Sequence, residues 1–387
     1  MTISINYPNA GTISPAGTTT VPNGDPFTCS VTSKVAGYSF SGWYSGNSLM
    51  STLQSYTFTP KNNISLEARY SIIHDASFSV TPTTANAPAN VTTTSTYNVE
   101  ITQRTWVVQD KITGEKLKNT TTNGTSNNSF NLNITKGRAL SITQTVTYTD
   151  GQQATSSVVK IVDEVVNKHF AWKYQKLEWY SLISYLFSIN NGSSTWDVPM
   201  NFSWYYNALS SSLPRTGSSD TSTSVVSSYV TYNDSKIKSM AQGILSYTSG
   251  WSDTDRVNYV LKFVQSIPYQ YDRLGKGAED YWKLPAETLW EGKGDCEDHA
   301  FLFASLVKAM GYKVIVHFIY CYEGGVLVAG HIATSVAVPG ANGYYTSING
   351  VKYYYCEATA EVGTKIRNDS NVGEKPAGYV IVQTWMI

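Results

Sequence analysis

A cysteine at the start of an apolar helical pattern is the residue with the clearest chemistry in this sequence. Residues 290–310 read WEGKGDCEDHAFLFASLVKAM, and from position 300 onward the apolar residues recur at helical spacing. This pattern predicts a helix that is buried on most sides and that ends before Gly311. Cys296 then lies in the first helical turn, where unpaired N–H groups and the helix dipole favour a thiolate. A thiolate is the nucleophile that acyl transfer requires.

A base and an acid follow the cysteine in the chain. Residues 313–320, 331–338 and 351–357 are rich in β-branched and aromatic side chains, which predicts three antiparallel strands. His331 opens the second run and Glu357 ends the third. A turn around residues 343–345 would place these two side chains next to each other, although Asn349-Gly350 is a competing turn. The order cysteine, histidine, carboxylate is that of a catalytic triad.

The same stretch resembles the transglutaminase-like superfamily, whose fold is papain-like, and in particular its members in archaeal and bacterial surface proteins. The motifs that carry the resemblance are PAETLWEGKGDCED (285–298), KAMGY (308–312), GH (330–331) and YCEAT (355–359). The resemblance covers residues 230–387. It implies that Cys296 is the nucleophile, His331 the general base and acid, and Glu357 the orienting acid. The superfamily more often has Asp in the third position, so Glu357 departs from its pattern.

Other polar and aromatic residues surround the predicted nucleophile. Asp295 and Asp298 are expected to cap the helix, and with Trp290 they are the candidates for the oxyanion site or the substrate pocket. Packing is the alternative role of Trp290. The nearby carboxylates should raise the pKa of the cysteine, so an imidazolium at His331 would have to activate it.

Two further histidines are open to other interpretations. His299 and Cys296 form a Cys-x-x-His pair, but no second pair at metal spacing exists, so we expect no metal and no cofactor. His299 is expected to form a hydrogen bond at the helix start, and His317 to be a satisfied core residue.

Composition places the chain among extracellular β-rich proteins. It has 387 residues, 28 basic and 28 acidic, with 14% charged residues and 28 tyrosines. The zero net charge gives no reason to expect a nucleic-acid partner. No apolar run is long enough to span a membrane, and no signal peptide opens the chain, so a trimmed or virion-borne protein is expected. Cys29, Cys321 and Cys356 are expected to be packed thiols.

Three domains are expected. Residues 1–72 contain GYSFSGWY (37–44) and resemble a small β-sheet repeat of bacterial surface proteins. Residues 73–167 alternate apolar and polar positions between turns, as in an immunoglobulin-like sandwich. Residues 168–387 are the predicted α+β catalytic domain, with helices starting near Asp234 and Ser252. Residues 168–230 show the weakest pattern, with aromatic residues of a core or a carbohydrate site and a Ser/Thr-rich loop at 210–228.

The expected function is that of a cysteine-dependent hydrolase with a Cys-His-Glu triad. Its substrate would be an amide or isopeptide bond in a protein or a peptide-containing polymer of a cell surface or cell wall. A cross-linking acyltransferase is one alternative. The other is a non-catalytic structural or adhesion protein of a surface or a virion assembly.

Overall fold

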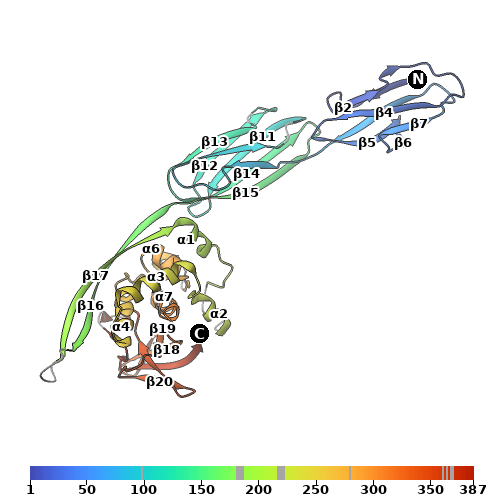
Figure 1. Cartoon of the computed structure of the whole chain (residues 1–387). Coiled ribbons are helices and arrows are strands. Elements are labelled where there is room, and N and C mark those ends of the chain that lie inside the picture. The colour runs from blue at the N-terminus through green and yellow to red at the C-terminus, as the bar shows by residue number, and fades with distance from the viewer. Residues whose placement is uncertain are drawn as a thin grey trace. The chain divides into compact units, whose positions relative to one another are not determined.

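The structure, a computed structural model, contains two compact units, Met1–Glu164 and Val165–Ile387. The described residues are 1–96, 99–126, 128–179, 187–215, 223–278, 280–359, 361–362, 365–366 and 370–387. Figure 1 shows strands throughout the first unit and helices only in the second. The chain is therefore multidomain, with all-β modules followed by an α+β part.

The first unit begins with a small β module. Its strands are β1 (Thr2–Ile5), β2 (Gly11–Ser14), β3 (Gly17–Thr18), β4 (Phe27–Lys34), β5 (Tyr38–Ser45), β6 (Ser48–Ser51), β7 (Ser55–Phe58) and β8 (Ser65–Ile72). They form a sheet of order β3-β1-β8-β5-β6 and a second of order β2-β4-β7. Along β8 every second residue is buried, and Leu66 packs with Trp43 and Cys29 in the core. The aromatic residues of the repeat-like motif therefore build a core.

The rest of the first unit is a β-sandwich. Its strands are β9 (Phe78–Thr81), β10 (Ala89–Ser95), β11 (Ile101–Asp110), β12 (Lys116–Asn123), β13 (Ser129–Ile134), β14 (Arg138–Tyr148) and β15 (Gln153–Val162). One sheet has the order β13-β10-β9 and the other β12-β11-β14-β15. Trp106 of the second sheet is 1% exposed and packs edge-on against Phe78 and Phe130 of the first. Alternation along the strands thus gives each sheet one apolar face.

A long hairpin opens the second unit, and the sequence analysis missed it. Strands β16 (Val165–Trp179) and β17 (Phe187–Asn201) pair along their whole length. Phe170 and Trp172 of β16 contact Phe263 of helix α4. The aromatic residues in this stretch therefore belong to the core. Phe170, Trp172 and Tyr174 alternate with exposed residues along β16, which is a strand signal that the sequence analysis did not use.

Seven helices follow in the described part of this unit. They are α1 (Phe202–Leu209), α2 (Thr223–Tyr229), α3 (Ser235–Tyr247), α4 (Asp253–Gln265), α5 (Asp272–Gly275), α6 (Pro285–Glu291) and α7 (Cys296–Ala309). The predicted caps are confirmed, since the side chains of Asp234 and Ser252 accept N–H bonds at the starts of α3 and α4. The predicted loop over 210–228 is wrong at its end, where α2 buries Val226 and Tyr229. Residues 216–222 of that prediction lie outside the described part.

The second unit also contains a five-stranded antiparallel sheet of order β20-β21-β19-β18-β24. The strands are β18 (Val314–Glu323), β19 (Val326–Val336), β20 (Tyr345–Ile348), β21 (Val351–Cys356) and β24 (Tyr379–Met386), and a separate pair is β22 (Glu361–Val362) and β23 (Lys365–Ile366). Helix α7 packs between this sheet and helices α3, α4 and α6. Its predicted burial is confirmed, because the side chains from Ala300 to Val307 are all buried.

Both turn signals of this stretch are used. Strands β19 and β21 pair from Thr334 to Val336 in a register centred on residue 345, as expected from a fold around residues 343–345. The competing turn at Asn349-Gly350, both with positive φ, joins β20 to β21 and does not shift that register. Cys321 and Cys356 are free and buried on strands separated by β19, as expected, and Cys29 is also free and buried. None of the described helices is long and apolar enough to cross a membrane.

Candidate active site

The turn before α7 sets the position of Cys296. Helix α6 ends at Gly292, whose φ of 66° ordinary side chains rarely adopt. A Cβ atom on Gly294 would lie 2.7 Å from the Cβ of Asp298, so the chain can pass this close only with glycine. Cys296 is then the first residue of α7, with Asp295 as its N-cap. The glycines of the motif therefore hold the cysteine at the helix start.

His331 and Glu357 form a buried pair. The Nε2 atom of His331 lies 3.0 Å from each carboxylate oxygen of Glu357. His331 is 2% exposed and Glu357 is fully buried. Because Nε2 is engaged by the carboxylate, Nδ1 is the nitrogen left to exchange a proton with another group.

Three neighbours fix the Glu357 residue in this orientation. The hydroxyl of Tyr355 donates to Oε2 at 2.7 Å, and the backbone N–H of Thr359 donates to Oε1 at 3.2 Å. The amide of Gln265 on α4 donates to the backbone carbonyl of Glu357 at 2.7 Å. Each carboxylate oxygen thus has a donor besides the histidine, which restricts the side chain to one rotamer.

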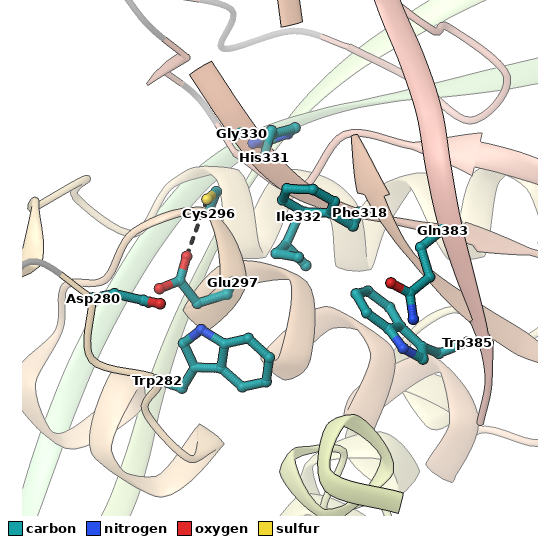
Figure 2. Close-up of a pocket in the computed structure, with 10 residues that line it drawn as sticks. All are labelled: Asp280, Trp282, Cys296, Glu297, Phe318, Gly330, His331, Ile332, Gln383 and Trp385. Atoms are coloured by element: carbon teal, nitrogen blue, oxygen red, sulfur yellow. Dashed lines mark hydrogen bonds between the residues drawn. The ribbon is translucent and has the colours of Figure 1, made fainter. Parts of the chain in front are cut away.

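Cys296 and His331 line one cavity of about 460 Å³ (Figure 2). The other lining residues are Asp280, Trp282, Glu297, Phe318, Gly330, Ile332, Gln383 and Trp385. The Cys296 thiol donates a hydrogen bond to Oε2 of Glu297 at 3.1 Å. Among the described residues, no hydrogen bond joins this thiol to His331. Cys296 and His331 therefore line the same cavity, but the thiol forms its hydrogen bond with the Glu297 carboxyl group.

The pKa of the Cys296 thiol is raised well above its ordinary value. Burial is the main cause, and the charges of Glu297 and Asp295 add to it. The backbone N–H of Ile332 acts in the opposite direction, but it does not outweigh the burial. The expectation that the helix start favours a thiolate is thus wrong for the free protein, because desolvation exceeds the dipole effect. The prediction that nearby carboxylates raise the pKa of this thiol is correct in direction.

This raised pKa predicts the pH dependence of thiol alkylation. A group with a raised pKa stays protonated at neutral pH, so the reactive thiolate fraction keeps increasing as pH rises through that pKa. We expect the rate of Cys296 alkylation by iodoacetamide to increase beyond pH 9 without a plateau near neutrality. Mass spectrometry of the labelled site measures the rate, and Cys296→Ala corrects for the other cysteines. A plateau reached by pH 7 would show a preformed thiolate–imidazolium pair instead.

The predicted capping carboxylates have different roles. Asp298 accepts from the Asp295 N–H at 3.4 Å and pairs with the buried Lys283 ammonium at 2.8 Å. Asp295 is buried, its Oδ1 has no hydrogen-bond partner, and burial with the Glu297 charge raises its pKa to about 11. Burial and the Asp298 charge raise the pKa of Glu297 to about 8. Neither Asp295 nor Asp298 lines the cavity, whereas Glu297 does.

Two sets of three carboxylates in this region have the spacing of cation ligands. Oxygens of Asp272, Asp280 and Glu297 lie within 4.8 Å of one another, and so do those of Asp272, Asp295 and Asp298. An all-oxygen set suits Ca²⁺ or Mg²⁺ and not zinc. Neither group contains Cys296 or His299, the pair considered from the sequence.

The remaining sequence candidates lie away from the cavity wall. Trp290 stacks on Tyr205 and packs edge-on against Phe202. The tryptophan that lines the cavity near Cys296 is instead Trp282. His317 bonds to Thr384 and Ser335, which confirms a satisfied core histidine. His299 has no hydrogen-bond partner at either ring nitrogen, and burial lowers its pKa to about 3. The predicted hydrogen-bonding role of His299 is therefore wrong.

The sequence analysis missed most of the cavity lining. Phe318 and Trp385 come from β18 and the distant β24, which the apolar pattern alone could not bring together. Asp280 and Trp282 come from the irregular segment before α6. The one available indication was Glu297, because it follows the nucleophile directly in the chain.

Two family models match the chain. Residues 235–347 match a transglutaminase-like domain, and residues 1–74 match the divergent InlB B-repeat domain. Both resemblances noted in the sequence are thereby supported: the second unit contains a transglutaminase-like domain, and the N-terminal module matches the InlB B-repeat model. No curated protein matches the chain.

Several solved structures show a distant likeness. LapG of Legionella pneumophila, treated with EGTA, is 18% identical and matches 39% of this chain and 80% of its own, with a TM-score of 0.27. An inferred cysteine protease of Cytophaga hutchinsonii is 11% identical over 78% and 77%, with a TM-score of 0.29. An inferred protease of Parabacteroides distasonis is 11% identical over 76% and 71%, with a TM-score of 0.23. TM-scores this low do not establish a common fold, so the domain assignment depends on the family model.

Proposed function

We propose that the second unit is a cysteine-dependent hydrolase or acyltransferase that acts on amide or isopeptide bonds. The observation that carries the proposal is the geometry of His331. Both oxygens of Glu357 hold its Nε2 at 3.0 Å, and its ring lines the same cavity as the Cys296 thiol. A histidine fixed by a carboxylate next to a cysteine is the arrangement that activates a thiol.

The reaction follows from the roles of these three residues. His331 takes the thiol proton at Nδ1, and Cys296 Sγ attacks the carbonyl carbon. The N–H group of Cys296 at the start of α7 stabilises the oxyanion. As the C–N bond breaks, His331 gives its proton to the leaving amine and a thioester remains. Water then attacks the thioester in hydrolysis, or a second amine attacks it in cross-linking, and the thiol is regenerated.

The N-terminal repeat module supports a location outside the cell. A match to the InlB B-repeat domain and a composition with 14% charged residues are both typical of surface proteins. We propose a protein or peptide-containing polymer of a cell surface or cell wall as the substrate. A virion surface remains the alternative location.

A non-catalytic protein that retains the fold is the rival hypothesis. The observation that favours it is the thiol bonded to Glu297, with its pKa raised by burial. Binding of a substrate would have to release this contact before His331 could accept the proton.

A test for catalytic turnover distinguishes the enzyme hypothesis from the non-catalytic one. The full chain would be incubated with a library of peptides and ε-linked isopeptides in ¹⁸O-water, with and without a primary amine. We expect product carboxyl groups that carry one ¹⁸O atom for hydrolysis, or new amides for transfer. Cys296→Ala should give neither product. Equal product from a folded Cys296→Ala variant, or no product from the wild type, would contradict an enzyme.

A further inference from the structure

The carboxylate of Glu357 is held less firmly by His331 alone than an aspartate would be. A glutamate side chain has one more rotatable bond than aspartate, so more rotamers compete with the one that reaches the histidine. Both carboxylate oxygens lie 3.0 Å from Nε2 of His331, so the histidine does not fix which oxygen accepts its hydrogen bond. A second anchor on the carboxylate would remove that freedom.

Tyr355 is the side chain that anchors this carboxylate. Its hydroxyl donates to Oε2 of Glu357 at 2.7 Å, a shorter distance than either oxygen has to His331. Both Tyr355 and Glu357 are fully buried, and a hydrogen bond to a charged group is strong away from water. Burial and the Glu357 charge raise the pKa of the Tyr355 hydroxyl well above its ordinary value, so it stays a donor at neutral pH.

The sheet fixes the ring of Tyr355. This residue lies in the part of β21 that pairs with β19, the strand that carries His331. Its ring belongs to a buried apolar cluster with Ile319, Cys321 and Ala333 of strands β18 and β19. A ring packed among neighbouring strands has little rotamer freedom, so the hydroxyl keeps its place relative to His331.

We propose that Tyr355 is a positioning residue of the proposed reaction and acts through the Glu357 carboxylate that holds His331. This inference rests on the proposed function and names a further residue on which it depends. Tyr355 does not line the cavity, so it acts on the carboxylate and not on the substrate. It also accounts for a glutamate where the superfamily more often has aspartate, because the hydroxyl meets the carboxylate at the longer reach of glutamate.

The alternative role of Tyr355 is packing alone. A buried tyrosine stabilises the sheet through its ring, whatever its hydroxyl contacts. Tyr355→Phe keeps the ring and removes only the hydroxyl, so its combination with a change at Glu357 separates the two roles. In a double-mutant cycle, effects that pass through a shared partner are non-additive, whereas independent effects add.

We expect Tyr355→Phe to lower kcat by about tenfold to a hundredfold, the range for loss of a hydrogen bond to a charged group. KM should not change, because no substrate contact is lost. In the Glu357→Gln background the same change should have no further effect on kcat. Tyr353→Phe is the matched control, a buried tyrosine on the same face of β21, and should keep the wild-type kcat. Equal losses in both backgrounds, or no loss in the wild-type background, would overturn the proposal.

A measurement without substrate separates this inference from the proposed function. In protein with ¹⁵N-labelled histidine, the proton on Nε2 of His331 gives a downfield NMR signal when a carboxylate holds it. We expect this signal to be absent in Glu357→Gln, to move upfield or broaden in Tyr355→Phe, and to stay unchanged in Tyr353→Phe. An unchanged signal in Tyr355→Phe would overturn the positioning role. A changed signal in a protein without amide turnover would contradict the proposed function alone.

Discussion

His331→Ala should reduce turnover by more than about a thousandfold while the protein stays folded. The imidazole lines the cavity with the Cys296 thiol and is held by Glu357, so it is placed to move a proton between the thiol and the leaving amine. In an enzyme whose histidine and nucleophile act as a unit, loss of the histidine costs about as much as loss of the nucleophile. The measurement is kcat with any substrate found by ¹⁸O incorporation, compared with Cys296→Ala.

The matched control for this variant is His317→Gln. His317 lies on the neighbouring strand β18, is fully buried and bonds to Thr384 and Ser335. Its replacement should lower the thermal midpoint but leave kcat per folded molecule close to that of the wild type. If His331→Ala kept more than a tenth of the wild-type kcat, the proposed general base would be wrong.

Glu357→Gln should lower kcat by about two to three orders of magnitude, less than His331→Ala. Tyr355 and Thr359 donate to the two carboxylate oxygens, so the glutamine amide would face the Tyr355 hydroxyl or the Thr359 N–H. The variant also loses the charge that stabilises an imidazolium. In a serine triad the corresponding change costs about 10⁴ in turnover. Cysteine is intrinsically the better nucleophile, which reduces the dependence on the third residue.

Asp298→Asn distinguishes an orienting acid from a structural one. Asp298 pairs with the buried Lys283, and breaking a buried pair costs about 3–5 kcal/mol. We therefore expect a lower thermal midpoint with little change in kcat of the folded fraction. The third triad member would be wrong if Asp298→Asn matched the loss of His331→Ala while Glu357→Gln kept full activity.

Local sequence determined the elements that carry the site. The apolar spacing after Cys296 defines α7, and capping residues define the starts of α3 and α4. The β-branched runs with His331 and Glu357 predict adjacent strands, and the carboxylate does lie against the histidine. These features depend on residues close in sequence, where backbone geometry and side-chain spacing are sufficient. The sequence analysis did not predict the long hairpin β16–β17, because it interpreted the aromatic residues there as core or carbohydrate-site residues and assigned them no secondary structure.

Only the tertiary structure decided the state of the nucleophile and the shape of its cavity. The position of Cys296 predicts a low thiol pKa, but burial and the charge of Glu297 raise it. The choice of Trp282 over Trp290 as a wall, and the contribution of β24, depend on which distant segments pack together. The reason is physical: desolvation and charge proximity are sums over neighbours that are far apart in the chain. Residue types and their spacing in the sequence therefore do not determine the pKa of the thiol or the lining of the cavity.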